Sequence, residues 1–154
     1  MKYMYNHGGR ATCYKGEAGD CVTRSISIIT GLPYQEVYDE LFSRSKVFAK
    51  GRSKAAKNLA KRGCSPRNGV LKKVHEAYLK ELGYVWFPTM HIGKGCKVHL
   101  RDDELPKGRI IVRVSKHLTS VIDGVLHDTY DCSRGGTRCV YGYFTKIYKT
   151  EKRI

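Results

Sequence analysis

The stretch His117-Leu-Thr-Ser-Val-Ile-Asp-Gly-Val-Leu-His-Asp128 consists of two short apolar runs on either side of an Asp-Gly pair. This pattern predicts a β-hairpin with a two-residue turn, because both turn positions favour residues that tolerate a positive φ. Such a turn places Thr119 opposite Asp128. Side chains alternate between the two faces of a sheet, so His117 then shares a face with Thr119 and Asp128. His127 is expected on the opposite face.

The rest of the chain predicts helices first and strands last, which is an α+β arrangement. From Cys21 to Thr30 the apolar residues recur at helical spacing, with Gly31 as the stop. The other expected elements are helices over 33–44, 53–62 and 69–82 (the last capped by Asn68) and strands over 84–87, 109–114, 125–130 and 139–148. Residues up to Asp20 are expected to be extended or loop. The helix over 69–82 is expected to carry His75 on its polar face.

Cys21 lies in the first turn of the predicted helix over 21–30, directly after Asp20 as a candidate N-cap. Unpaired backbone N–H groups and the positive end of the helix dipole stabilise a thiolate at such a position, which lowers the pKa of the thiol. Many first-turn cysteines are inert packing residues, so the position alone fits either role.

His117 and Asp128 make Cys21 a candidate nucleophile. Asp128 lies diagonally across the hairpin from His117, at roughly 7–8 Å between backbones, a separation that the two side chains can bridge. A cysteine hydrolase needs a histidine that takes the thiol proton and an acid that fixes the histidine tautomer. Asp131 is the alternative acid, because a three-residue turn with a bulge would put it on the histidine's face. Asp-Gly favours the two-residue turn and therefore Asp128.

The order of these residues resembles the papain-like cysteine peptidase superfamily: Gly19-Asp-Cys21 opens an apolar helix, His117 begins a late strand and Asp128 lies on the next one. The resemblance is to compact bacterial members, such as the bacteriocin-processing peptidases, more than to papain. Segments 19–24, 30–34, 105–109 and 117–131 also resemble a group of bacteriophage and prophage proteins. The resemblance implies an N-terminal cysteine-bearing helix packed against a C-terminal antiparallel sheet. It also implies a thiol-dependent hydrolase or acyltransferase, with a peptide or protein as the leading substrate class.

One position departs from the pattern of that superfamily. Papain-like enzymes place a Gln about six residues before the cysteine, where its amide joins the oxyanion hole, and here Lys15 stands at that position. Loss of one oxyanion donor costs on the order of 100–1000-fold in rate. Asn6, Tyr14 and Lys15 itself are the candidate replacements. Tyr130, opposite His117 in the hairpin, is either a wall of the cleft or a core residue.

The net charge of +15 comes from 29 Lys and Arg residues against 14 Asp and Glu residues. Eleven of the basic residues and none of the acidic ones lie between Leu41 and His75, so the other 119 residues carry a net charge of only +4. We therefore expect one domain over residues 1–154 with a basic helical insert at about 44–67. The candidate anion-binding residues of this insert are Lys54, Lys57, Lys61 and Arg62.

Two readings of the basic segment, and two alternatives to an enzyme, stay open. In the first, the positive charge of residues 44–73 attracts an anionic partner, either nucleic acid or an acidic host protein. In the second, these residues are only solvated surface. The chain as a whole could be a catalytically inactive papain-like scaffold that binds through this segment. A structural or assembly protein with incidental thiols is the third hypothesis.

The cysteine usage and hydropathy predict an intracellular protein. The N-terminal residues lack the apolar stretch of a signal peptide, and no apolar run approaches the roughly 18 residues of a membrane span. We therefore expect a soluble protein in the cytoplasm of a bacterial host, with free thiols and no membrane contact.

The spacings nearest to those of a metal site are Cys132 with Cys139 and the run His91, Cys96, His99. Both lack the close ligand pairs of zinc modules, so no metal or cofactor is expected. The sequence does not indicate an oligomeric state.

Overall fold

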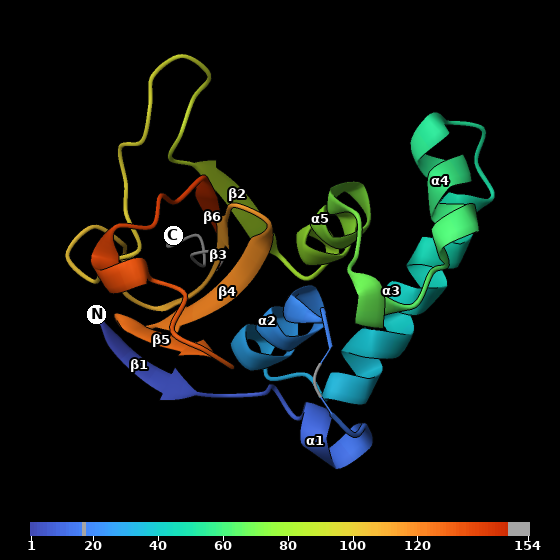
Figure 1. The fold of residues 1–154 in the computed structure, drawn as a ribbon, viewed down its shortest axis with the longest axis horizontal. Helices are drawn as coiled ribbons and strands as arrows, with labels where there is room; N and C mark the ends of the chain where they lie inside the picture. The colour runs from blue at the N-terminus through green and yellow to red at the C-terminus, as the bar shows by residue number, and fades with distance from the viewer. Residues whose placement is uncertain (17, 148–154) are drawn as a thin grey trace, which may run out of the picture.

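The computed structural model describes residues 1–16 and 18–147, which form a six-stranded sheet with helices packed against it (Figure 1). The strands are β1 (Lys2–Tyr5), β2 (Tyr84–Pro88), β3 (Arg109–Val114), β4 (His117–Ile122), β5 (Val125–Asp128) and β6 (Gly142–Lys146). Their order across the sheet is β1-β5-β4-β3-β6-β2. Neighbouring strands are antiparallel except β1, which pairs in parallel with β5. The mixed α/β architecture is confirmed, and the expected antiparallel pairing holds for β2 to β6, but the N-terminal strand β1, which joins the sheet in parallel, was not expected.

β4 and β5 form the predicted hairpin. Its two turn residues have positive φ, 48° at Asp123 and 79° at Gly124, as a tight two-residue turn requires. The ladder has the predicted register, with Ser120 opposite His127. β5 ends at Asp128, two residues before the expected end. The register therefore brings the start of β4 and the end of β5 to the same end of the sheet.

The helices are α1 (Arg10–Cys13), α2 (Cys21–Thr30), α3 (Tyr34–Ala49), α4 (Lys54–Arg62) and α5 (Lys72–Glu81), with short 3-10 helices at Pro66–Asn68 and Arg134–Gly136. α2 has the predicted bounds, and Gly31 ends it with a left-handed φ of 78°. α3 runs past its predicted end near Arg44, because neither Gly nor Pro interrupts the chain before Gly51. Leu71, and not Asn68, is the N-cap of α5.

The first 20 residues, expected to be extended or loop, contain the strand β1, which is extended, and the helix α1, which was not expected. All four residues of β1 are exposed, so β1 lacks the alternating pattern that marks a half-buried strand. Its place in the sheet depends on backbone pairing with β5, far along the chain, from Lys2 opposite Val125 to Tyr5 opposite Asp128. The strand expected over 139–148 is shorter, and Tyr148 lies outside the described residues.

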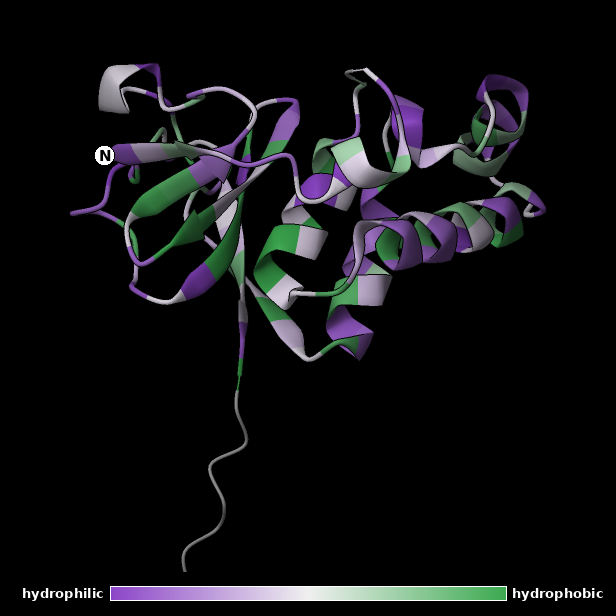
Figure 2. Cartoon of the chain, turned by 90° about the horizontal axis from the view of Figure 1, so that it is seen from below, coloured by the Kyte–Doolittle hydropathy of each residue, from purple (hydrophilic) through white to green (hydrophobic). Residues whose placement is uncertain are grey.

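Apolar side chains cover both faces of the sheet. On one face the helices bury a cluster that includes Ile26 of α2, Leu79 of α5 and Phe144 of β6. On the other face the connecting segments cover a second cluster, with Val112 and Leu126 at its base. Figure 2 shows green, apolar residues on the strands and on the adjacent helices, whereas purple and green alternate along α3. Within the described ranges, no helix is both long and apolar enough to cross a bilayer.

α2 is fixed to the sheet at both ends by hydrogen bonds as well as by packing. Near its start, Ser25 Oγ donates to the backbone carbonyl of Leu118 in β4 at 2.9 Å. At its end, Arg109 Nε donates to the Ile29 carbonyl at 2.9 Å, which satisfies a carbonyl without a helical partner. These contacts hold the first turn of α2 at the end of the sheet where β4 begins.

Candidate active site

Cys21 begins α2, so its side chain lies beside the backbone N–H groups of the first helical turn. Asp20 is the N-cap residue, as predicted, but its carboxylate makes no capping hydrogen bond. Burial by itself raises the pKa of the Cys21 thiol. The hydrogen bond and the charge of His117, with the backbone of Leu118, outweigh burial and lower this pKa below its usual value.

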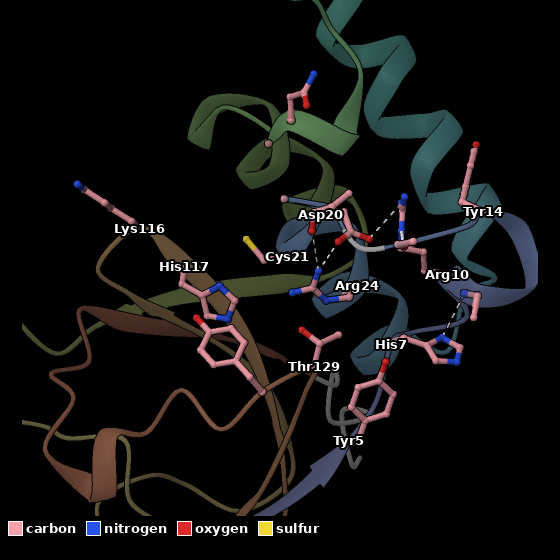
Figure 3. Close-up of a pocket in the computed structure, with 17 residues that line it drawn as sticks. Tyr5, His7, Arg10, Tyr14, Asp20, Cys21, Arg24, Lys116, His117 and Thr129 are labelled. Carbon is pink, nitrogen blue, oxygen red and sulfur yellow. Dashed lines mark hydrogen bonds and ion pairs between the residues drawn. The ribbon is translucent and has the colours of Figure 1, made fainter.

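His117 begins β4 and Asp128 ends β5, and their side chains meet beside the start of α2. His117 Nε2 lies 2.7 Å from Asp128 Oδ2. Burial by itself lowers the pKa of His117, but hydrogen bonds with Asp128, Cys132 and Cys21 raise it to about 12. Figure 3 shows Cys21 and His117 next to each other at one end of the cleft. A protonated imidazole beside a thiol of lowered pKa favours a thiolate–imidazolium pair.

The Asp128 carboxylate is held by several donors. Its Oδ2 also accepts a hydrogen bond from Thr119 Oγ1 at 2.6 Å, and its Oδ1 accepts one from the Thr129 backbone N–H at 2.7 Å. Burial raises the pKa of Asp128, but the hydrogen bond and charge of His117 and the two threonine bonds lower it below its usual value. The carboxylate is therefore ionised and fixed in orientation, as the acid of a Cys-His-Asp triad must be.

A buried ion-pair network lies behind the thiol, and sequence analysis missed it. Asp20 is completely buried, contacts Arg24 and Arg10, and accepts a hydrogen bond from the Tyr34 hydroxyl. Arg24 also reaches Asp128 Oδ1 at 3.4 Å, so it links the start of α2 to the end of β5. The sequence pattern that could have predicted part of this network is the spacing of Asp20 and Arg24, because oppositely charged residues four positions apart can form an ion pair on one helix. Arg10 in α1 and Tyr34 in α3 are distant from Asp20 in the sequence, so no short-range pattern indicates that they contact it.

A cleft of about 530 Å³ opens beside Cys21 and His117 (Figure 3). Its wall comes from β1, α1 and the loop before α2, and includes Tyr5, His7, Arg10 and Tyr14. A second hollow of about 360 Å³ adjoins it, and Cys21, His117 and Lys116 line both. The lining of the second hollow is more apolar and includes Val22, Val70, Leu118 and Tyr141. Cys21 and His117 therefore lie where the two hollows meet.

Two of the four expected accessory residues line the cleft. Tyr14 does so, and so does Tyr130, whose ring lies 5.3 Å from the His117 ring. Tyr130 is 48% exposed, so it is a wall of the cleft and not a core residue. Asn6 and Lys15 are not among the lining residues: the Asn6 amide is bonded within its own loop and to β5, and Lys15 is exposed. The cleft offers an oxyanion the backbone N–H groups at the start of α2, whereas the Tyr14 hydroxyl accepts a hydrogen bond from Gln35 Nε2 at 2.9 Å and points away from Cys21 in Figure 3.

The basic insert spans the end of α3, α4 and the following 3-10 helix. In Figure 1, α4 lies at the far end of α3 from α1. Its exposed basic residues are those predicted to bind anions: Lys54, Lys57, Lys61 and Arg62. Arg44 differs, because its guanidinium binds Glu40 at 2.8 Å and Glu81 at 2.5 Å, which neutralise its charge. The chain returns to the site directly after the insert, since Asn68 and Gly69 line the cleft.

Two expectations about other residues are wrong. His75 is not on a polar face but buried, with Nε2 2.9 Å from Arg113, and burial and this neighbouring charge lower the pKa of His75 to about 4. Cys96 and Cys139, expected to be free thiols, form a disulfide with their Cα atoms 5.9 Å apart. The backbone bridge between His99 and Cys139 brings these distant segments together, which their spacing in the sequence does not reveal.

Cys132, to which sequence analysis assigned no role, lies beside the candidate triad. Its side chain is buried, and its sulfur lies 3.7 Å from Asp128 Oδ2. One ligand atom each from His117, Asp128 and Cys132 falls within 4.8 Å of the others, so these three residues could hold a metal ion. An ion there would occupy the imidazole that the thiol needs, so metal binding and acid–base chemistry at this site exclude each other.

No family model, curated protein or solved structure matched the chain. The papain-like resemblance therefore stays a prediction, and the function must be argued from the side chains in the cleft. Three observations bear on it: the helix-borne thiol, the imidazole fixed by a buried carboxylate, and the pair of hollows that meet at them.

Proposed function

We propose that the protein is a cysteine-dependent hydrolase of the papain-like type that cleaves peptide bonds, with Cys21 as nucleophile, His117 as general base and acid, and Asp128 as the orienting acid. The observation that carries the proposal is the 2.7 Å hydrogen bond between His117 Nε2 and Asp128 Oδ2 beside a thiol of lowered pKa. A purely structural histidine has no need of a buried carboxylate on one side and a first-turn cysteine on the other. The resemblance to bacteriophage proteins favours action in the cytoplasm of a bacterial host.

In the proposed reaction the Cys21 thiolate attacks the substrate carbonyl carbon, and the carbonyl π electrons move to oxygen to give a tetrahedral oxyanion. Backbone N–H groups at the start of α2 donate hydrogen bonds to this oxyanion. The imidazolium of His117 then gives its proton to the leaving amine as the C–N bond breaks, which leaves a thioester on Cys21. His117, now neutral, takes a proton from water, whose attack releases the acid and restores the thiolate–imidazolium pair.

The shape of the site favours an extended substrate. Two hollows meet at Cys21 and His117, so a chain that crosses the thiol would occupy both. The first hollow has the more polar lining and the second the more apolar one, with Lys116 at the border between them. Lys116, which has no acidic partner among the described residues, favours an acidic side chain near the scissile bond, and the apolar hollow favours an aliphatic or aromatic side chain beside it.

The test is thiol reactivity followed by hydrolysis. Under reducing conditions, wild-type protein is treated with iodoacetamide at pH 7, and the modification rate of each free cysteine is measured by peptide mass mapping. Cys21 is expected to react at least tenfold faster than Cys64, which has no imidazole partner among the described residues. His117→Ala should remove the difference and leave the rate at Cys64 unchanged. Equal rates at the two cysteines in wild type would defeat the proposal.

Hydrolysis is then measured with a peptide library, and Cys21→Ala is compared with the conservative control Cys64→Ser. The expected outcome is cleavage that survives in Cys64→Ser and disappears in Cys21→Ala. A reactive Cys21 with no cleavage of any peptide would favour the inactive-scaffold alternative.

The exposed lysines of α4 favour a second candidate function, the binding of nucleic acid. Lys54, Lys57 and Lys61 have no acidic partner among the described residues, unlike Arg44 at the other end of the insert. Binding of a labelled duplex should weaken steeply as salt rises, survive Cys21→Ala, and weaken when the three lysines are changed to Glu. Unchanged binding by the triple variant would remove this candidate, and binding of an acidic protein instead would identify the other predicted partner.

A further inference from the structure

A second cluster of potential ligand atoms lies away from the candidate active site. Cys96 and His99 come from the loop that precedes β3, and Cys139 lies just before β6. The backbone bridge between His99 and Cys139 joins the two segments, and the disulfide between Cys96 and Cys139 crosses the same junction. These residues border the apolar cluster on the face of the sheet opposite the helices, where Val98 and Val140 pack.

His99 has the position of a metal ligand with an orienting partner. Its Nε2 lies 3.7 Å from Cys96 Sγ, and its Nδ1 lies 3.2 Å from Glu104 Oε1. The same carboxylate oxygen accepts a hydrogen bond from the His99 backbone N–H at 3.2 Å. A histidine that binds a metal through one nitrogen usually donates its other N–H to a carboxylate, which fixes the ring and raises its basicity. Glu104, which also contacts Arg101 at 3.4 Å, therefore holds the His99 ring with its Nε2 near Cys96.

Two separations match those of a tetrahedral site, whereas the sulfurs of Cys96 and Cys139 are bonded to each other and must move apart on reduction. A zinc ion with bonds of about 2.3 Å to sulfur and about 2.0 Å to nitrogen sets a sulfur and a nitrogen ligand about 3.6 Å apart, and two sulfur ligands about 3.8 Å apart. The separation of Cys96 Sγ and His99 Nε2, 3.7 Å, matches the first value. The thioether of Met90, 3.8 Å from Cys139 Sγ, matches the second.

We propose that, once the Cys96–Cys139 disulfide is reduced, the two thiolates and His99 Nε2 bind a zinc ion, with Glu104 orienting the imidazole. Reduction takes two electrons and two protons from a thiol or phosphine reductant and yields two thiols. Binding of Zn²⁺ then releases those two protons and forms two Zn–S bonds and one Zn–N bond. Water or the Met90 thioether fills the fourth position. The loop over 89–99 is thus joined to the start of β6 in either redox state, by a disulfide or by the metal.

The test uses the full chain, reduced with a phosphine under argon and titrated with Co²⁺ as a spectroscopic substitute for zinc. The expected result is one equivalent of Co²⁺ bound, with thiolate-to-cobalt absorption in the near ultraviolet and the visible bands of tetrahedral cobalt, both removed by added Zn²⁺. The oxidised protein should show neither. Absence of these bands in the reduced protein would overturn the proposal.

Variants locate the ion. Cys139→Ser and His99→Ala should each weaken binding at least tenfold, and Glu104→Gln should weaken it by about 10-fold to 100-fold if the carboxylate orients the ring. Far-ultraviolet circular dichroism checks that each variant folds, and His99→Ala leaves the disulfide available as a check on the loop. The matched control is Cys13→Ser, an exposed free thiol in α1, which should bind as wild type does. Loss of the bands in Cys132→Ser, with retention in His99→Ala, would place the ion beside His117 and refute this site.

Discussion

Replacement of Asp128 by Asn is expected to lower the pKa of His117 and so to narrow the pH range over which the thiolate–imidazolium pair exists. Asp128 Oδ2 lies 2.7 Å from His117 Nε2, and both side chains are almost completely buried. For charges about 4 Å apart, at the effective dielectric constant of about 20 that suits such pairs, the attraction is about 4 kcal/mol. One pKa unit corresponds to about 1.4 kcal/mol, so loss of the carboxylate charge should lower the pKa of His117 by roughly three units.

The imidazole of the variant therefore stays charged at pH 7 and loses its proton in the alkaline range, roughly three pH units earlier than in wild type. Above that pH Cys21 no longer faces a cation, and its pKa moves toward the ordinary value for cysteine, about 8.5. The assay is the pH titration of the His117 ring by NMR, with the signals of that ring assigned by comparison with His117→Ala.

Asp131→Asn is the matched control, because it removes a nearby carboxylate that bonds to Ser133 and not to His117. Its His117 titration should follow that of wild type. The reasoning is refuted if Asp128→Asn leaves the titration of His117 where it was, or if Asp131→Asn shifts it by the same amount.

Three further outcomes are expected. Arg24→Met should destabilise the fold by about 3–5 kcal/mol in urea unfolding, since it leaves two buried carboxylates without their shared cation; a loss below about 1 kcal/mol would contradict this. Gly142→Ala should cost about 1–3 kcal/mol, because a Cβ there would lie 2.4 Å from the ring of Trp86; an unchanged melting temperature would be the contrary result. The stability difference between wild type and Asp128→Asn should depend on pH. Because the pKa of Asp128 is lowered in the folded state, its contribution to the free energy of unfolding is present above about pH 3.8 and is lost as pH falls through the folded pKa. Because the pKa of His117 is raised, its contribution is present below about pH 6.5 and is lost as pH rises toward about 12. The difference should therefore be largest between about pH 4 and 6.5, and a flat profile in urea unfolding across pH 3–9 would exclude the coupling.

Local patterns were enough to predict the hairpin and the helix of the candidate site. The Asp123-Gly124 turn fixes the register by itself, and the register places His117 and Asp128 within reach of each other. The bounds of α2 follow from its apolar spacing and from Gly31, which again are short-range signals. Correct prediction of the residues that meet in the site therefore needed only one long-range assumption, that α2 packs against β4.

Features that depend on contacts between distant segments could not be predicted, because no short-range pattern in the sequence marks them. β1 shows no alternating burial, and only its backbone pairing with β5 makes it a strand. Burial of His75 and pairing of Cys96 with Cys139 require knowledge of which segments lie opposite them in space. Arg10 and Tyr34, which also contact Asp20, come from the separate helices α1 and α3, and no spacing in the chain indicates that.

The separation of the site's residues along the chain determines when the site can exist. Cys21 emerges early during synthesis, whereas His117 and Asp128 follow only after most of the protein has been made. β1 cannot join the sheet earlier either, since Tyr3 donates its hydrogen bond to the carbonyl of Asp128, 125 positions away. A nascent chain on the ribosome therefore carries the Cys21 thiol without the His117 imidazole, and the two meet only when both ends of the polypeptide come together. Under the proposed function, an unfinished chain has the nucleophile but not the base, so hydrolysis begins only once synthesis is nearly complete.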